Sequence, residues 1–316
     1  VFEMFTVKEV SVLALVLIAL TVPRGDGYAV GEIQLRNEDP DGERIINGIE
    51  AEAGQFSYTV SLRIQMNAGY PKKHACGGSL IRPSWVLTAA HCVRGYVETD
   101  YDIRAGVTQL DDDGAERRKA KKIYRHPHYD APDNDVALIQ LDSPLPITDK
   151  HHTTSLLDST IEEFIGEPVA DPQTDNLTNK HPKVHISLVE LDNGNNSLSQ
   201  NCQVSGWGLT STGGYVSPKL LYASVKFVEE RSCVEKFVGF NAITPNMICY
   251  GGDDTDTCNG DSGGPLTCKT NDGGVKLVGV TSFGKSCATP GTPGVYARVS
   301  AALTWIEETI RDNSSE

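Results

Sequence analysis

Short hydrophobic runs separated by turn residues dominate the chain from residue 45 onward. In each run, apolar, β-branched and aromatic side chains follow one another closely, and Gly, Pro, Asn and Asp fill the spaces between runs. The clearest runs are 58–64, 84–89, 135–141, 202–208, 275–283 and 294–299. Many short strands with turns between them are typical of antiparallel barrels and sandwiches. We therefore expect an all-β protein.

The end of the chain follows a different pattern. Val299, Leu303, Ile306 and Ile310 recur at the spacing of one helix face. We expect the chain to close with an amphipathic helix that packs on the β body.

The residues before position 45 lack the β pattern and predict export. Residues 10–23 are an uncharged apolar run of 14 residues, which is shorter than the roughly 20 needed to span a bilayer. A small residue, Ala29, follows at a suitable cleavage position, so we expect a signal peptide over 1–29. Residues 30–44 are polar and acidic, which is typical of an exposed, cleavable linker.

Composition and charge narrow the class of protein. The chain has 316 residues, 39% of them hydrophobic, and a net charge of -14. This hydrophobic content is sufficient for a folded core. The negative charge disfavours nucleic acids and anionic membranes, so we expect neither as a partner. One basic run departs from this balance, and we interpret it as a solvated loop or edge strand rather than a partner-binding patch. It consists of Arg117, Arg118, Lys119, Lys121 and Lys122.

Cysteine usage points to an oxidising, extracellular compartment. All eight cysteines lie between residues 76 and 287, an even number consistent with four disulfides, although spacing alone does not pair them. The chain has no CxxC, no HExxH and no zinc-like Cys/His cluster, so we expect no metal and no cofactor. The polar stretch 150–200 indicates a long surface connection. Sequons for N-glycosylation begin at Asn176, Asn195 and Asn313.

The segment GDSGG, residues 260–264, carries a candidate nucleophile, Ser262. It matches G-x-S-x-G, the nucleophile elbow of α/β-hydrolases, but that fold needs a His after the serine and none follows residue 185. The order Asp, His, Ser is also awkward if His91 is the base, because residues 45–90 contain no Asp. The order His, Asp, Ser accommodates all three groups.

Two further segments supply candidate partners for the serine. His91 lies in LTAAHC, and both Asp133 and Asp135 lie in DNDVALIQL. A serine hydroxyl is a poor nucleophile, so a neutral imidazole must take its proton, and a carboxylate must hold that imidazole in the right tautomer. Spacing alone selects neither His91 from the eight histidines nor Asp135 over Asp133.

Together these motifs resemble those of the trypsin-like (chymotrypsin-fold) serine proteases. LTAAHC, DNDVALIQL, VSGWG and GDSGGPL occur in that family's order, with RIING at its activation junction, and the resemblance covers about residues 45–311. It implies two six-stranded antiparallel β-barrels with the active site in the cleft between them. It also implies a catalytic triad of His91, Asp135 and Ser262. The backbone N–H groups of Gly260 and Ser262 would form the oxyanion hole.

The disulfide pattern of the family uses every cysteine of this chain. It implies the pairs Cys76 with Cys92, Cys202 with Cys268, Cys233 with Cys249, and Cys258 with Cys287. Each bridge typically stabilises a fold by about 2–4 kcal/mol.

The resemblance further implies activation by cleavage and a preference for basic residues. A cut after Arg44 would free the α-amine of Ile45, which inserts beside Asp261 as a buried ion pair. Asp256 falls at the base of the primary specificity pocket, where its carboxylate favours a substrate Lys or Arg.

The other pocket residues come from two nearby segments. Gly284 and Gly294 would form the pocket walls, and Ser282 to Gly284 would pair with the substrate backbone as an added strand. Phe283 stands where the family usually has Trp, and Lys285 adds a charge at the pocket mouth. These departures leave the primary preference intact.

We therefore expect a secreted serine endopeptidase that cleaves after Arg or Lys, with a signal peptide (1–29), an activation propeptide (30–44) and a protease domain (45–316). Its expected partners are protein or peptide substrates with Arg or Lys, an activating protease and protein protease inhibitors, and we expect a monomer. The alternative is a protease-like binding or regulatory protein without turnover. A serine-directed phosphonate discriminates between the two, since a binding-only protein shows no stoichiometric labelling.

Overall fold

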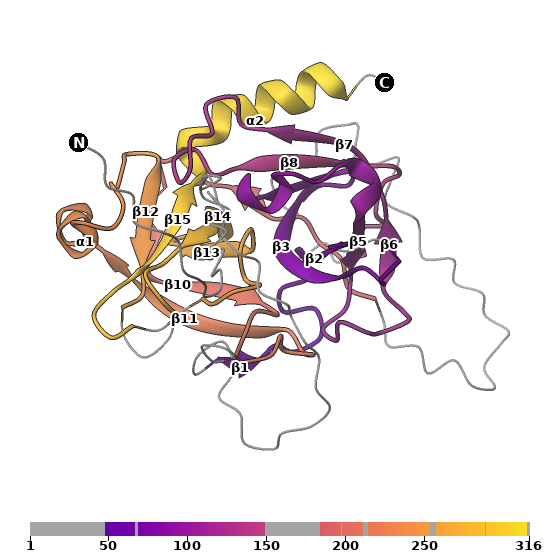
Figure 1. Ribbon diagram of the computed structural model, residues 1–316, viewed down its shortest axis with the longest axis horizontal. Helices are drawn as coiled ribbons and strands as arrows, with labels where there is room; N and C mark the ends of the chain where they lie inside the picture. Colours follow the sequence, from indigo (N-terminus) through magenta and orange to yellow (C-terminus); the bar gives the residue numbers. More distant parts are fainter. Residues whose placement is uncertain are drawn as a thin grey trace, which may run out of the picture. The chain divides into compact units, whose positions relative to one another are not determined.

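Two curved antiparallel β-sheets form the body of the chain (Figure 1). The computed structural model describes residues 48–66, 69–148, 184–196, 198–210, 214–252, 257–287 and 289–314. Several predicted features lie outside these residues: the signal peptide, the activation segment with Arg44 and Ile45, residues 149–183 of the long connection, Asp256 and Asn176.

The first sheet has seven strands. In spatial order they are β6 (Glu116–Arg118), β5 (Tyr101–Ala105), β2 (Thr59–Ile64), β3 (Lys73–Arg82), β4 (Trp85–Thr88), β8 (Ala137–Leu141) and β7 (Ala120–Arg125). Only Lys119 separates β6 from β7, so the chain itself joins the two ends of this sheet.

The second sheet is a closed barrel. Its strands follow one another in the order β10 (Leu198–Gly206), β13 (Pro265–Thr270), β14 (Val275–Phe283), β15 (Gly294–Arg298), β12 (Met247–Tyr250) and β11 (Leu221–Val228). Because β11 pairs with both β10 and β12, the six strands form a ring. Two short strands are added to it, β1 (Ile49–Glu50) on β11 and β9 (Glu190–Leu191), which is parallel to β14. The expected all-β, two-barrel fold is confirmed.

β3 is a strand that the hydrophobic pattern does not predict. Its sequence begins with two polar residues and has adjacent glycines in the middle. These glycines permit close packing: a Cβ on Gly77 would lie 2.9 Å from the Cα of Gly264, and one on Gly78 would lie 2.7 Å from a methyl of Val86. β3 therefore lies directly against the turn that carries Ser262.

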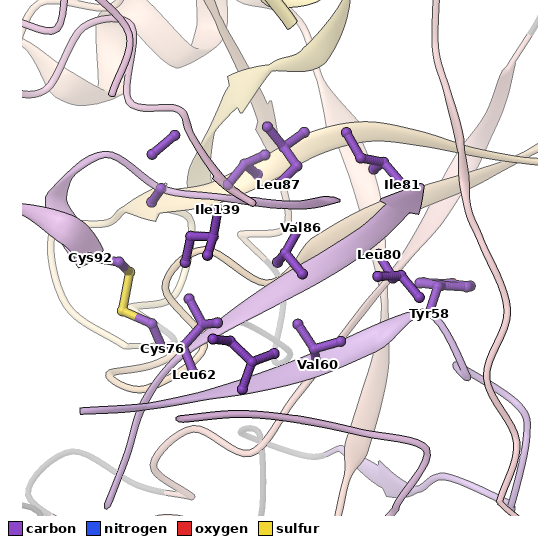
Figure 2. Packing of buried hydrophobic residues seen from close by; sticks show 14 of the residues in the cluster. Tyr58, Val60, Leu62, Cys76, Leu80, Ile81, Val86, Leu87, Cys92 and Ile139 are labelled. Carbon is purple, nitrogen blue, oxygen red and sulfur yellow. A yellow bond between two sulfur atoms is a disulfide. The ribbon is translucent and has the colours of Figure 1, made fainter. Parts of the chain in front are cut away.

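One hydrophobic cluster links the two sheets. Figure 2 shows its part around β2, β3 and β4, where buried side chains converge with the Cys76–Cys92 disulfide at one side. The same cluster includes Trp207 and Leu277 from the second half of the chain. Residues of both sheets therefore share a core, which fixes the elements that carry the site.

The disulfides join all eight cysteines in the pairs that the resemblance implies. They are Cys76–Cys92, Cys202–Cys268, Cys233–Cys249 and Cys258–Cys287. The first links β3 to the short helical turn η1 (His91–Val93), and the last links the turn before Ser262 to the segment after β14.

The predicted C-terminal helix is confirmed as α2 (Val299–Asn313), which packs on β14 and β9. Its buried side chains are Val299, Ala302 and Ile306. Leu303, which the hydrophobic pattern predicts on the buried face, is only half-buried because it lies at the edge of that face. Ala302 is buried in its place.

A second helix, α1 (Glu230–Phe237), escapes prediction because only two of its eight residues, Cys233 and Phe237, are buried. No helix in the described part of the chain is long and apolar enough to cross a membrane.

The basic run lies on β6 and β7, at the ends of the first sheet, in agreement with the edge-strand interpretation. Of the sequon residues, Asn195 is exposed. Asn313 is half-buried, and its side-chain amide donates a hydrogen bond to the carbonyl of Thr309 over 2.8 Å.

Candidate active site

His91 and Asp135 form a hydrogen-bonded pair that the strand register brings together. β4 and β8 are antiparallel neighbours, and Thr88 pairs with Ala137, so the residues just after β4 meet those just before β8. His91 Nδ1 donates to Asp135 Oδ2 over 2.7 Å, and the backbone N–H of His91 donates to Oδ1 over 2.9 Å. In the neutral ring this arrangement leaves Nε2 as the proton acceptor.

The structure separates the roles of Asp135 and Asp133. Asp135 is 2% exposed and also accepts a hydrogen bond from Ser282 Oγ over 2.6 Å. Asp133 instead accepts from Thr244 Oγ1 over 2.6 Å and from Asn246 Nδ2 over 3.2 Å. Thr244 and Asn246 lie just before β12, so Asp133 ties the loop to the second barrel while Asp135 contacts the histidine.

The electrostatics of the pair favour an ionised Asp135 and a basic His91. Burial lowers the pKa of His91, but the charge of Asp135 and the hydrogen bond to it outweigh burial and raise that pKa above its ordinary value. Burial raises the pKa of Asp135, whereas the charge of His91 and the hydrogen bonds from His91 and Ser282 bring it below its ordinary value. The His91 side chain is 27% exposed, so a reactant can reach it.

Ser262 lies on a turn that packs against the segment before His91. The backbone N–H of Gly77 in β3 donates to the carbonyl of Ser262 over 2.8 Å. A Cβ on Gly263 would lie 2.6 Å from the Gly77 carbonyl and 3.1 Å from the nitrogen of Ala89, two residues before His91. Gly263 has a φ of 78°, which also favours glycine. This close packing brings the Ser262 turn to the His91 segment.

Gly260 is expected to supply one N–H of the oxyanion hole. Hydrogen bonds to its own carbonyl and to the preceding one fix the orientation of its backbone. Its φ is 96°, and its carbonyl accepts a hydrogen bond from His74 Nε2 over 3.0 Å. The preceding carbonyl, of Asn259, accepts from the N–H of Leu209 over 2.7 Å. Because the peptide is trans, this turns the N–H of Gly260 to the opposite side.

His74 is a residue of the site that the sequence pattern does not reveal. It lies in β3, 186 residues before its partner Gly260, and Ser61 Oγ donates to its Nδ1 over 2.8 Å. Because a carbonyl can only accept, Nε2 carries a proton, and in the neutral ring Nδ1 is then the acceptor. Burial is the largest cause that lowers its pKa, to about 4; the hydrogen bond to Gly260 opposes this, and the charge of Arg63 adds to it.

The buried His74 predicts a loss of stability in acid. An unfolded histidine binds its proton near pH 6.5, whereas folded His74 does so near pH 4. The stability due to neutral His74 is therefore full above about pH 6.5 and is lost as the pH falls toward about 4, by about 3 kcal/mol. Glutamine does not titrate. Between pH 7 and pH 4, we therefore expect the free energy of unfolding, measured in urea, to fall by about 3 kcal/mol less in His74→Gln than in the wild type. Equal losses would contradict the assignment.

Asp261 fastens the Ser262 turn to the second barrel. It is 1% exposed, and its carboxylate oxygens accept from the N–H groups of Gly208 over 2.8 Å and Cys258 over 2.9 Å. A Cβ on Gly206 would lie 2.2 Å from this carboxylate, and one on Gly208 would lie 2.3 Å from it. The two glycines of VSGWG therefore make room for Asp261. Ile45, its expected partner, lies outside the described residues.

The predicted pocket walls lie at the ends of two neighbouring strands. Ser282 and Phe283 are the last residues of β14, Gly284 follows, and Gly294 begins β15. Among the residues that the structure describes, a Cβ on Gly284 would meet only the carbonyl of Ser286, at 3.9 Å, so these residues leave space beside Gly284.

The expected base of the pocket, Asp256, lies outside the described residues. It is two residues from Cys258 in the chain. The disulfide between Cys258 and Cys287 joins that segment to the one that follows Gly284.

The described residues contain one group of three potential metal-binding side chains, Cys76, His91 and Cys92. The two sulfurs form a disulfide and so offer no thiolate, and His91 Nδ1 is bonded to Asp135. This group does not fit a metal ion.

Comparison with known proteins points to one family. The family model described as Trypsin matches residues 45–306. The chain is 34% identical to cationic trypsin-3 of Rattus norvegicus, with 87% of this chain and 93% of the rat protein covered. It is also 34% identical to chymotrypsin-like elastase family member 3B of Macaca mulatta, with 84% and 93% covered. Identity to trypsin 5G1 of Aedes aegypti is 34%, with 84% of each chain covered.

Proposed function

Because the chain belongs to the trypsin family of serine proteases, we propose that it is an endopeptidase that cleaves proteins and peptides after Arg and Lys. We assign the chemistry to Ser262, His91 and Asp135. The observation that carries this assignment is the 2.7 Å hydrogen bond between His91 and the buried Asp135, next to the turn of Ser262.

In the proposed reaction, Ser262 forms a covalent intermediate. His91 Nε2 takes the hydroxyl proton as Ser262 Oγ attacks the carbonyl carbon of the bond to be cleaved. Asp135 stabilises the imidazolium, and the N–H groups of Gly260 and Ser262 bind the oxygen that becomes negative. The imidazolium then gives its proton to the leaving amine. Water, activated by the same histidine, hydrolyses the acyl-enzyme and releases Ser262.

We assign the preference for basic residues to Asp256. A carboxylate at the base of an enclosed pocket forms a charge-assisted hydrogen bond with a substrate Lys or Arg. The open space beside Gly284 supports room for a long side chain. Since one relative is named as an elastase, the preference needs its own test.

Replacing Asp256 with Ser should reduce kcat/KM for Arg-amide substrates at least about 100-fold, because a basic side chain would then enter the pocket without its charged partner. Amide substrates with Ala or Leu before the cleaved bond should be affected far less. The measurement is kcat/KM across Arg, Lys, Ala and Leu substrates. Asp272→Ser, at an exposed turn after β13, is the matched control and should leave the preference for Arg unchanged. A wild-type enzyme that prefers Ala would contradict the proposed specificity.

We also propose that the protein is secreted as a zymogen. The apolar run at 10–23 and the four disulfides support export into an oxidising compartment. Cleavage after Arg44 would then release Ile45, whose ammonium would pair with the buried carboxylate of Asp261. The substrates, an activating protease and protein inhibitors would be the protein partners of this enzyme.

A further inference from the structure

Lys285 is a cation held in place by aromatic rings. Its Nζ lies 5.6 Å from the ring centre of Phe237 and 5.9 Å from that of Phe240. Phe237 is buried, Phe240 is 50% exposed, and Phe283 packs edge-on against Phe237 at 5.7 Å. We call these four residues the Lys285 cluster. Cation–π contacts restrict the ammonium to this position while its outer side stays in solvent.

The Lys285 cation has no carboxylate partner among the residues that the structure describes. The chain as a whole carries a charge of -14. A fixed cation on such a protein favours a negative group from another molecule.

The Lys285 cluster borders the strand end that leads to the catalytic pair. Ser282, three residues before Lys285, donates its hydroxyl proton to Asp135. The edge of β14 that faces β13 is paired with it only as far as Val280, which lies opposite Pro265. The next residue, Thr281, forms backbone hydrogen bonds with the turn that carries Ser262. Among the described residues, no strand continues this edge past Thr281.

The direction of a bound peptide follows from this arrangement. A peptide that adds to this edge as an antiparallel strand runs from Lys285 toward Ser282, and its carboxyl end reaches the catalytic pair. Residues before the cleaved bond therefore lie beside Gly284 and Lys285. A strand rises by about 3.3 Å per residue, so the second, third and fourth substrate residues before the cleaved bond come within reach of the Lys285 side chain.

We propose that Lys285 selects substrates with carboxylates shortly before the cleaved bond, and that the activation segment of this chain is such a substrate. This inference rests on the proposed cleavage after Arg. Glu43 and Asp41 are the second and fourth residues before the bond after Arg44, and Asp39 and Glu38 lie farther from it, at the sixth and seventh positions. One active molecule would thereby recognise the acidic segment of another and activate it.

The test compares two peptides in each enzyme variant. One peptide is NEDPDGERIING, residues 37–48, and the other is NQNPNGQRIING, in which the four acids are replaced by amides. Enzyme cleaved at Arg44 should process the acidic peptide about fivefold faster in kcat/KM, the effect of one favourable exposed ion pair. Lys285→Gln should bring the ratio to about one, and Lys285→Glu should invert it. Lys269→Gln, on the exposed end of β13, is the matched control and should keep the wild-type ratio.

The outcomes separate this inference from the proposed function. If wild-type enzyme cleaves both peptides after Arg44 but Lys285→Gln leaves the ratio unchanged, Lys285 does not select the acids, and the proposed function stands. A preference of the wild type for the neutral peptide also overturns the inference. If the wild type cleaves neither peptide after Arg44, the proposed function itself fails. A ratio that falls toward one in high salt only for enzymes with Lys285 supports the ionic contact.

Discussion

Replacing Ser262 with Ala should lower kcat on an Arg-amide substrate about 10⁶-fold, because no other group can form the acyl-enzyme. The turn should survive the change, since its contacts use backbone atoms: the carbonyl of Ser262 accepts from Gly77, and the N–H of Gly263 donates to Thr281. Substrate binding should therefore persist in the inactive variant. The measurements are kcat by steady-state kinetics and the Kd of a peptide by calorimetry.

Labelling with a serine-directed phosphonate provides the control for Ser262. One equivalent should react with the wild type and with Ser286→Ala, a change at an exposed serine near the proposed pocket, and none with Ser262→Ala. Turnover that persists in Ser262→Ala would rule out its role as nucleophile. A wild-type protein that binds peptides but neither turns over nor reacts with the phosphonate would be the binding protein considered as the alternative.

Replacing Asp135 with Asn should lower kcat about 10⁴-fold, because an amide that donates to Nδ1 selects the wrong tautomer of His91. It should also move the acid limb of the pH profile. In the wild type, kcat/KM rises as His91 loses its proton, with a midpoint above about pH 6.5, since Asp135 raises the pKa of His91 despite burial. Without the carboxylate only burial remains, and the midpoint should fall below about pH 6.5.

Asp133→Asn is the matched control for Asp135, because it changes a carboxylate two residues away that bonds to Thr244 and Asn246 rather than to His91. It should reduce activity far less and leave the midpoint unchanged. The profiles are measured as kcat/KM between pH 5 and pH 9. The same midpoint in wild type and Asp135→Asn would contradict the coupling between Asp135 and His91.

The residues of the candidate site could be found from the sequence only in part. Ser262 and His91 stand in short local motifs, and a family resemblance assigns their roles. The choice between Asp133 and Asp135 depends on the pairing of Thr88 with Ala137, which no local pattern contains. His74 and the contact of Ser282 with Asp135 escape notice, because each of these residues bonds to a residue more than a hundred positions away in the chain.

In the fold, too, the local sequence pattern predicts some strands, whereas other features depend on contacts between residues that are far apart in the chain. Runs such as 275–283 are apolar enough to predict a strand, and β14 covers the same residues. The hydrophobic pattern does not predict β3, because its two central glycines make room for Gly264 and Val86 and contribute no apolar side chains to a pattern. Only the family resemblance implies the disulfide pairs, since the distance between two sulfurs depends on the completed fold.

The contacts of the loop 133–135 have a consequence for when the enzyme acquires activity. Asp135 bonds to His91, which follows β4 of the first sheet, and to Ser282 in β14 of the second. Asp133 bonds to Thr244 and Asn246. A nascent chain in which only the N-terminal half has folded lacks β14 and the segment before β12. It therefore lacks the hydrogen-bond donors that position the loop with Asp135. Proteolytic competence therefore cannot precede the docking of both halves, and in the proposed zymogen it still waits for cleavage after Arg44.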